Sequence, residues 1–176
     1  MNQCSVFVRH RKLNTEYHPH TRPMKIGLLS DTHGFLDPRL PRIFRGVEHI
    51  FHAGDIGPDH LITQLESIAP VTAVLGNTDA SALCRLTETI ILGGRKFLVQ
   101  HIVAPHALTG ELQVRLSRER PEVVLFGHTH QQFNQVINGV WFLNPGYAGK
   151  PKFGAARSVA MLEGDAKELR VEFIEL

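Results

Sequence analysis

The stretch Lys25–His33, KIGLLSDTH, places a short apolar run directly before an aspartate and a histidine. The same arrangement recurs at Val123–His130, VVLFGHTH, where an apolar run precedes two histidines. Short runs this apolar are typical of strands that are buried on both faces. The two stretches therefore predict buried strands that carry polar, metal-binding side chains at their ends.

Strands and helices alternate along the rest of the chain. Gly93-Gly94 and Asn138-Gly139 separate apolar runs and are typical of hairpin turns. This alternation predicts an α/β layer fold with buried sheets. We expect strands over 25–30, 49–53, 71–75, 88–92, 96–100, 123–126, 132–137, 140–143, 157–163 and 168–175, and helices over 38–46, 58–68 and 107–118.

Polar residues that can bind a metal follow five of the expected strands. Because ligands of such sheets gather beyond the carboxyl ends of the strands, we expect these side chains to meet at one edge of the sheet. The residues are Asp31, His33, Asp55, Asn77, His101, His128 and His130.

The local spacing supports the same interpretation. Asp31 and His33 are two positions apart, and residues so spaced in an extended backbone point the same way. The same holds for His128 and His130. Glycines stand just before several of the candidate ligands and permit sharp turns or close backbone approach there; they are Gly54, Gly76 and Gly127.

Each candidate taken singly also has a purely structural interpretation. Asp, Asn and Gly favour turns, and a buried histidine such as His101 is often a hydrogen-bonded core residue. The metal interpretation depends on all five strand ends carrying such residues. Carboxylate, imidazole and amide ligands suit Mn²⁺, Fe²⁺, Zn²⁺ or Ni²⁺ better than Mg²⁺ or Cu⁺. A thiolate zinc site is excluded, because none of the candidates is a cysteine.

In this order, the motifs resemble those of the calcineurin-like metallophosphoesterases, and in particular their small single-domain bacterial and archaeal phosphodiesterases. The resemblance covers residues 24–176 and implies a four-layer αββα sandwich, an α/β (α+β) fold with two mixed β-sheets and flanking helices. The motifs are D-T-H at 31–33, H-A-G-D at 52–55, G-N-T-D at 76–79, a histidine at 101, G-H-T-H at 127–130 and N-P-G at 144–146.

The resemblance also implies a role for each candidate. One metal ion would take Asp31, His33, Asp55 and His130, and a second would take Asp55, Asn77, His101 and His128. Asp55 would bridge the two ions, Asn77 would also bind the phosphate, and Asp55, Asn77 and His101 form the expected catalytic set. The implied cofactors are two divalent transition-metal ions, Mn²⁺ first and Ni²⁺, Fe²⁺ or Zn²⁺ as alternatives. Such a pair can hold a hydroxide that attacks a phosphate ester in line.

The sequence departs from the family pattern at two places. Many members carry a leaving-group histidine where this chain has Thr78, which predicts substrates with good leaving groups or an acid supplied from elsewhere, with His52 and His106 as candidates. The family usually has His-Gly-His where this chain has His101-Ile102-Val103. Asp79 is interpreted either as a residue that orients a ligand or as a turn residue. Further residues are interpreted as substrate contacts or as surface charges: Arg39, Arg85, Lys150, Lys152 and Arg157.

Composition and charge bear on partners and location. Residues 24–176 hold 15 basic and 16 acidic side chains, so the charge totals give no reason to expect nucleic-acid binding. The mild excess of basic residues lies in residues 1–23, which we expect to be a disordered extension without a role in the fold. With only Cys4 and Cys84, the chain suits a reducing compartment. We expect a cytoplasmic protein without membrane association. The sequence does not decide whether the protein forms a homo-oligomer.

Three functions compete at this point. The leading hypothesis is a phosphodiesterase that acts on a small phosphate ester or a nucleotide. A phosphomonoesterase or phosphoprotein phosphatase is the nearest alternative, although such phosphatases usually use the histidine that Thr78 replaces. A non-catalytic interaction scaffold, like the retromer subunit that shares this fold, is the third. The complete set of candidate ligands favours the enzymes.

Overall fold

The computed structural model describes residues 23–80, 83–152, 154–165 and 168–176. The expected extension at 1–23 therefore lies, apart from Pro23, outside the described residues. The elements in chain order are β1 Met24–Leu29, α1 Leu40–Ile43, β2 His49–His52, α2 His60–Glu66, β3 Val71–Ala73, β4 Thr87–Leu92, β5 Arg95–Gln100, α3 Gly110–Glu119, β6 Val123–Leu125, β7 Gln132–Ile137, β8 Val140–Pro145, β9 Ser158–Gly164 and β10 Leu169–Glu175.

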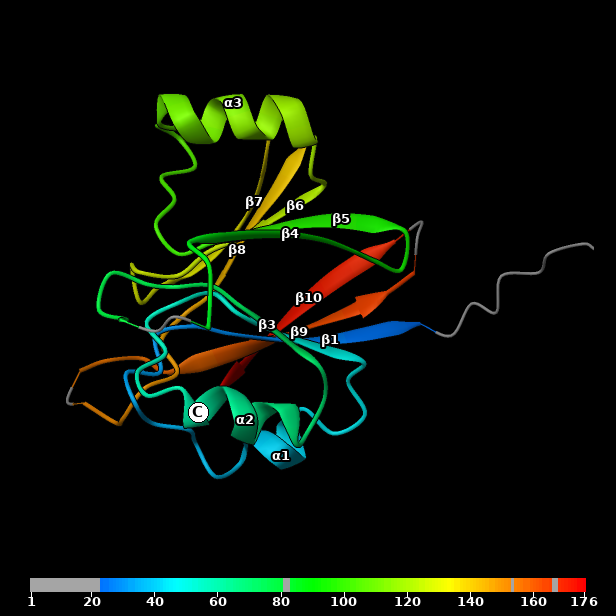
Figure 1. Ribbon diagram of the computed structural model, residues 1–176. Coiled ribbons are helices and arrows are strands. Elements are labelled where there is room, and N and C mark those ends of the chain that lie inside the picture. Colours follow the sequence, from blue (N-terminus) through cyan, green and yellow to red (C-terminus); the bar gives the residue numbers. More distant parts are fainter. Residues whose placement is uncertain (1–22, 81–82, 153, 166–167) are drawn as a thin grey trace, which may run out of the picture.

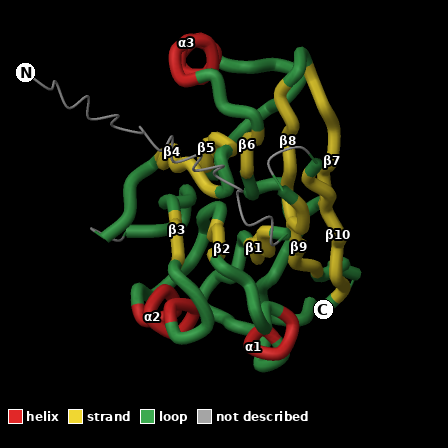
Figure 2. The backbone as a smooth tube through the Cα atoms, turned by 90° about the vertical axis from the view of Figure 1, so that its right-hand side faces the viewer, coloured by secondary structure: helices red, strands yellow, loops and turns green. Residues whose placement is uncertain are grey.

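The strands form two mixed sheets of five strands each. One has the order β10-β9-β1-β2-β3, and the other has the order β4-β5-β6-β8-β7. The sheets lie face to face, with α1 and α2 outside the first and α3 outside the second (Figures 1 and 2). This confirms the expected four-layer sandwich. No helix in the described part of the chain is long and apolar enough to cross a membrane.

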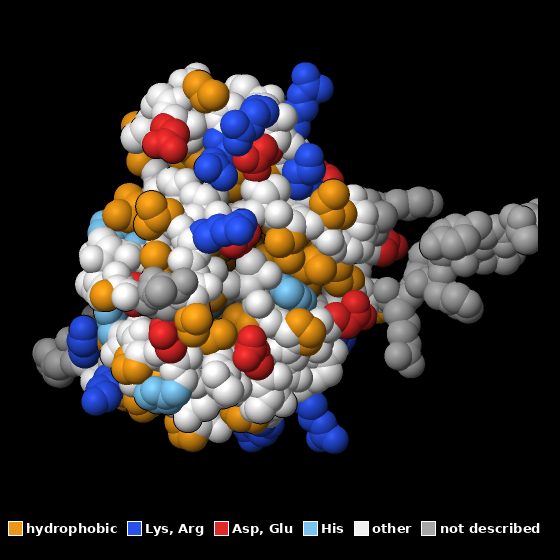
Figure 3. Space-filling view, in the orientation of Figure 1, with side chains coloured by type: hydrophobic (Ala, Val, Ile, Leu, Met, Phe, Trp, Pro, Cys, Tyr) orange, Lys and Arg blue, Asp and Glu red, His pale blue; other side chains and the backbone are white. Residues whose placement is uncertain are grey.

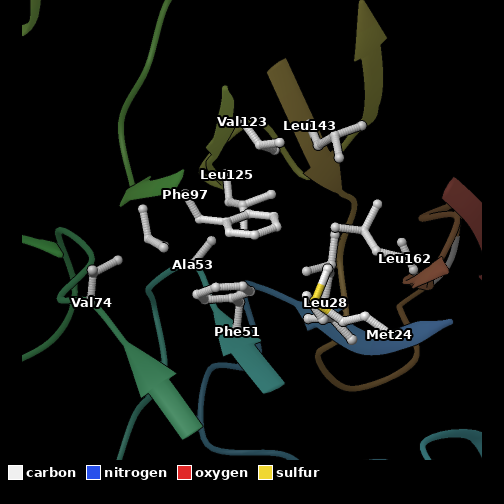
Figure 4. Close-up of a cluster of buried hydrophobic side chains, with 13 residues drawn as sticks. Met24, Leu28, Phe51, Ala53, Val74, Phe97, Val123, Leu125, Leu143 and Leu162 are labelled. Carbon is white, nitrogen blue, oxygen red and sulfur yellow. The ribbon is translucent and has the colours of Figure 1, made fainter. Parts of the chain in front are cut away.

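Three apolar clusters hold the layers together. The largest lies between the sheets, where Phe51 of β2 meets Phe97 of β5 with ring centroids 5.3 Å apart (Figure 4). Leu40 and Leu65 belong to a second cluster under α1 and α2, and Leu112 to a third under α3. Burial of side chains of this size stabilises the fold by roughly 1.5–3 kcal/mol each.

All three helices differ from the expected bounds, and α2 is two residues shorter at each end than the helix expected over 58–68. The helix expected over 38–46 shortens to α1, because the chain leaves the helical conformation at Phe44, whose fully buried ring packs against Gly27. The helix expected over 107–118 begins later, because Thr109 takes the extended backbone of an N-cap residue. Leu108 still packs against the cluster under α3, although it precedes the helix.

The strand ends of both sheets meet at one place. β1 runs parallel to β2, and β5 runs parallel to β6. Within the sheets, the Asp31 N–H donates to the Gly54 carbonyl at 2.9 Å and the Gly127 N–H donates to the His101 carbonyl at 3.0 Å. Between the sheets, the His101 ring contacts the Ala53 carbonyl. The candidate ligands therefore project from both sheets, whereas the sequence predicted a single sheet edge.

Candidate metal centre

Asp31, His33 and His130 form the first ligand group, in which one ligand atom of each lies within 4.8 Å of the others. The His130 Nε2 atom lies 3.3 Å from the Asp31 Oδ1 atom and 3.3 Å from the His33 Nε2 atom. Asp31 follows β1 and is fully buried, whereas the His33 and His130 side chains are 28% and 41% exposed. This group lies where solvent and a substrate can reach it.

Asp31, Asp55 and His101 form the second ligand group, and all three are buried. The His101 Nε2 atom lies 3.4 Å from the Asp55 Oδ2 atom, and the His33 Nε2 atom lies 3.7 Å from that same oxygen. Asp55 thus faces histidines of both groups through one carboxylate oxygen. This is the position that a bridging ligand requires.

The other two expected ligands lie beside these groups. The exposed His128 has its ring centroid 5.3 Å from that of His101, and its backbone N–H donates to both carboxylate oxygens of Asp31 at 3.2 Å. Asn77 is exposed, follows the buried Gly76 and lines the same pocket as His101. The structure thus gathers the candidates at one site, while their role as metal ligands stays a prediction.

Five of the seven candidates have left-handed backbone conformations, with φ between 46° and 70°. Such conformations are uncommon for residues other than glycine and cluster at functional sites. They correct the prediction that Asp31 and His33, or His128 and His130, point the same way from extended backbone. Each of these pairs reaches the site from a tight turn. The five residues are Asp31, His33, Asp55, His128 and His130.

The expected close approach at the glycines is confirmed. A Cβ atom at Gly76 would lie 2.0 Å from the Asp55 Oδ1 atom, and one at Gly54 would lie 2.6 Å from the His101 Nδ1 atom. At both positions, any side chain would displace a candidate ligand. The glycines thus leave room for the ligands themselves.

His101 carries the clearest sign that the site fits a cation. Its Nδ1 atom lies 2.7 Å from the Ala53 carbonyl oxygen. Because a carbonyl only accepts, Nδ1 carries the hydrogen and Nε2 presents a lone pair. That Nε2 atom is buried, faces the Asp55 carboxylate and has no hydrogen-bond partner among the described residues. A lone pair opposite a carboxylate oxygen is unfavourable unless a cation, either a proton or a metal ion, lies between them, and a metal ion can bind both atoms.

The pKa values of the two carboxyl groups shift in opposite directions. Burial raises the pKa of Asp31, because no solvent stabilises its charged form, although the Ser30 hydroxyl and nearby imidazoles oppose the shift. Burial also acts to raise the pKa of Asp55, but hydrogen bonds from Thr78 and the nearby His101 and His33 together outweigh it, and the pKa falls below its ordinary value. Burial lowers the pKa of His130. The shifts at His130 and Asp55 favour a neutral imidazole and an ionised carboxylate, which are the forms that bind a metal.

Asp79 serves the site by holding its loops. Its carboxylate accepts the backbone N–H groups of Ile56 at 3.0 Å, Gly57 at 2.8 Å and Gly76 at 2.9 Å. These bonds join the turn after Asp55 to the turn before Asn77. Asp79 therefore positions candidate ligands from two strand ends, rather than capping one turn alone.

Tyr147 is a residue of the site that the sequence did not reveal. Its ring is 1% exposed and stacks on the His130 ring, with centroids 4.7 Å apart and planes 25° apart. The His33 ring lies 6.2 Å away. Tyr147 thus packs against both histidines of the first group. Tyr147 directly follows the N-P-G motif at 144–146, and this position in the sequence could have marked it as a candidate.

The two candidate leaving-group acids differ in their exposure to solvent. His52 is fully buried, and its Nε2 atom lies 2.8 Å from the Thr32 hydroxyl. Burial lowers the pKa of His52 to about 3, so its ring is neutral at physiological pH and serves the packing of β2. His106 is exposed, and its ring packs against Phe133 of β7. The Thr78 N–H donates to the Asp55 Oδ1 atom at 3.0 Å, which fixes the carboxylate.

Some of the candidate substrate contacts are held in ion pairs, and others are exposed. Arg157 is buried, donates from Nη2 to the Asp37 Oδ2 atom at 2.9 Å and contacts the Gly149 carbonyl, so it is neither a surface charge nor a free substrate contact. Arg39 donates to both carboxylate oxygens of Asp37, at 2.9 Å each. Its hydrogen bonds hold the pKa of Asp37 well below the ordinary value. Lys152 lies over the Tyr147 ring at 5.1 Å. Arg85 and Lys150 are exposed.

Comparison with known proteins places these observations in a family. Residues 24–167 match the calcineurin-like phosphoesterase superfamily domain. A Methanothermobacter thermautotrophicus protein named probable metallophosphoesterase is 35% identical over 163 residues, which cover 86% of this chain and 92% of that protein. A Methanocaldococcus jannaschii phosphodiesterase is 28% identical over 173 residues, which cover 86% of this chain and 100% of the relative.

A solved structure shares the fold at lower identity. The Vps29 single mutant of Entamoeba histolytica superposes with a TM-score of 0.69 at 18% identity, over 87% of this chain and 99% of that chain. The domain match covers most of the chain and spans every candidate ligand from Asp31 to His130. The chain therefore belongs to the calcineurin-like phosphoesterase superfamily.

Proposed function

We propose that the protein is a phosphodiesterase that depends on two divalent metal ions. The observation that carries the proposal is the buried, unpartnered Nε2 atom of His101 opposite the Asp55 carboxylate. An enzyme of this family has a use for such an arrangement, whereas a core histidine would find a hydrogen-bond donor. The match to the family supports a phosphoesterase, and the M. jannaschii relative bears the name phosphodiesterase.

The family resemblance assigns the ligands to two ions, whereas the two ligand groups seen in the structure share Asp31. Asp31, His33, Asp55 and His130 would bind one ion, and Asp55, Asn77, His101 and His128 would bind the other. Bound divalent ions would supply Lewis acidity toward the phosphate oxygens and lower the pKa of a water at the site. The oxygen and nitrogen donors suit Mn²⁺, Ni²⁺, Fe²⁺ and Zn²⁺ alike, and Mn²⁺ is the first candidate that the family resemblance implies.

The chain's own residues would orient the reaction. The Thr78 N–H fixes the Asp55 Oδ1 atom, which leaves Oδ2 toward His33 and His101. The exposed amide of Asn77 would hold the phosphate beside them. Thr78 is a poor proton donor, and His52 is buried and neutral. We therefore expect small diesters or nucleotides with good leaving groups to react faster than monoesters with poor ones.

The activity is tested by hydrolysis with a panel of metals. Purified protein is assayed with Mn²⁺, Ni²⁺, Fe²⁺, Zn²⁺ or Mg²⁺ on bis-p-nitrophenyl phosphate and on p-nitrophenyl phosphate, before and after EDTA. We expect the diester to react faster, with Mn²⁺ or Ni²⁺, and EDTA to stop the reaction. Faster monoester hydrolysis would favour a phosphatase. Inactivity with every metal would favour an interaction scaffold, a use that fits the fold shared with Vps29.

A further inference from the structure

A pocket of about 750 Å³ opens beside the candidate metal centre. Asn77 and His101 are among the residues that line it, so the pocket adjoins the site that would bind the phosphate. Residues 75–77 and 84–87 contribute to its lining, as do residues of the first turns of α3. Its size falls within the range of small-molecule sites in proteins. The pocket is therefore placed to receive whatever group is attached to the phosphorus.

Two large apolar side chains stand exposed in this pocket. Leu86 is 71% exposed and Ile102 is 51% exposed, and both line it. Ile102 occupies the position where the family usually has glycine, directly after His101. A side chain of this size at that position adds apolar surface to a wall that the metal ligand itself begins. Exposed apolar side chains that gather in a concavity are typical of a ligand site.

The wall formed by α3 is mixed in character. Leu112 is apolar, whereas Thr109, Glu111 and Arg115 bring a hydroxyl, a carboxylate and a guanidinium to the same pocket. The Arg115 side chain is 30% exposed and lies 3.5 Å from the Glu119 carboxylate. On the side of the molecule seen in Figure 3, hydrophobic and basic side chains lie close together near α3. A ligand with both apolar faces and polar edges could contact both kinds of side chain.

We infer that this pocket binds the nucleoside part of the substrate, with the base against Leu86 and Ile102. A nucleobase has apolar faces and polar edges, which matches apolar side chains on one side and polar groups on α3. The inference rests on the proposed function, because the phosphate would lie at the metal centre. Leu86 and Ile102 would then determine specificity, without taking part in the reaction at phosphorus.

The test measures binding, so that it does not depend on turnover. Mn²⁺-loaded protein is titrated by calorimetry with AMP, ribose 5-phosphate and inorganic phosphate. AMP and ribose 5-phosphate differ at the anomeric carbon, where AMP carries the base and ribose 5-phosphate carries a hydroxyl. We expect AMP to bind at least about tenfold more tightly than ribose 5-phosphate, because a base buried against two apolar side chains contributes an effect of that size.

Three variants separate the pocket from the rest of the molecule. Leu86→Ser and Ile102→Ser should each reduce the AMP preference to less than about threefold and leave phosphate affinity unchanged. Val136→Ser, which removes a 68% exposed side chain from β7, should keep the full preference. Equal affinities in the unsubstituted protein, or a preference that survives both pocket substitutions, would overturn the inference.

The failures of the two proposals are distinguishable. Hydrolysis of diesters without any preference for AMP would overturn the pocket alone. A clear preference for AMP in a protein that hydrolyses no diester would support the pocket and overturn the proposed activity.

Discussion

The Nε2 atom of His101 lies 3.4 Å from the Oδ2 atom of Asp55, across the boundary between the two sheets. His101 is 2% exposed and Asp55 is 3% exposed. His101 follows β5 of one sheet, and Asp55 follows β2 of the other. The two-sheet architecture thus brings together two groups that neither sheet could join alone. Since burying polar groups without partners is costly, this pair is the part of the fold that most needs a bound cation.

Asp55→Asn should abolish hydrolysis while the fold persists. An asparagine oxygen can still accept the Thr78 N–H, so the turn should keep its hydrogen bond. The lost charge removes the proposed bridge between the ions. We expect kcat/KM for bis-p-nitrophenyl phosphate to fall more than about 100-fold, beyond the usual effect of residues that only support ligands. The exposed Asp59→Asn is the matched control. Full activity in Asp55→Asn would refute the bridging role.

Asp79 should contribute to stability and to metal affinity together. Asp79→Ala removes the acceptor of three backbone N–H groups and should lower the free energy of unfolding by roughly 2–4 kcal/mol. Asp79→Asn retains one oxygen, which can still accept the Ile56 and Gly76 N–H groups, and should cost about half as much. Urea unfolding and Mn²⁺ titration measure the two effects. An alanine variant with unchanged stability and metal affinity would show that these bonds do not position the loops.

Tyr147 should act through its ring. Tyr147→Phe keeps the stacking on His130 and loses only the hydroxyl, which donates to the Lys150 carbonyl at 3.1 Å. We expect this variant to bind Mn²⁺ with nearly unchanged affinity. Tyr147→Leu removes the ring and should weaken Mn²⁺ binding about 10-fold or more, because second-layer contacts typically contribute that much. Equal affinities for Phe and Leu variants would contradict the role of the ring.

His52 should make stability depend on pH. Its pKa is lowered to about 3 by burial, whereas its ordinary value is 6.5, so the unfolded chain binds an additional proton between these values. This contribution to stability is complete above pH 6.5 and is lost as the pH falls toward 3, at up to about 1.4 kcal/mol per pH unit. Urea unfolding of the metal-free protein at pH 7 and pH 5 should show a smaller loss for His52→Gln. The exposed His60→Gln is the control, and identical losses in all three proteins would contradict the assignment.

The strands and the identity of the site residues could be predicted because both follow from local sequence. Short apolar runs mark buried strands, and the polar residue after each run falls where the chain leaves the sheet. Lys25–His33 illustrates this, since β1 ends at Leu29 and Asp31 is the second residue after it. The role of Gly54 and Gly76 could also be predicted, because a side chain at either position would collide with a neighbouring candidate ligand.

What the sequence did not reveal depends on tertiary contacts. The left-handed backbone at Asp31 and His33 follows from hydrogen bonds to the neighbouring turn after β2, where the Gly54 and Asp55 carbonyls accept the two N–H groups. Arg157 is buried because Asp37, 120 residues away, neutralises it. Tyr147 lies beside His130 because β8 returns the chain to the site. The pattern of apolar and polar residues within one segment does not indicate contacts with residues far away in the sequence.

The stoichiometry of Mn²⁺ binding tests the central claim most directly. Metal-free protein is titrated with Mn²⁺ by calorimetry, and the metal content of the dialysed product is measured by mass spectrometry, for the natural chain and for His101→Gln. We expect up to two ions per chain, and a loss of one ion in the variant, because His101 belongs to only one of the two proposed sites. A chain that binds no Mn²⁺, or a variant that binds as many ions as the natural chain, would contradict the account.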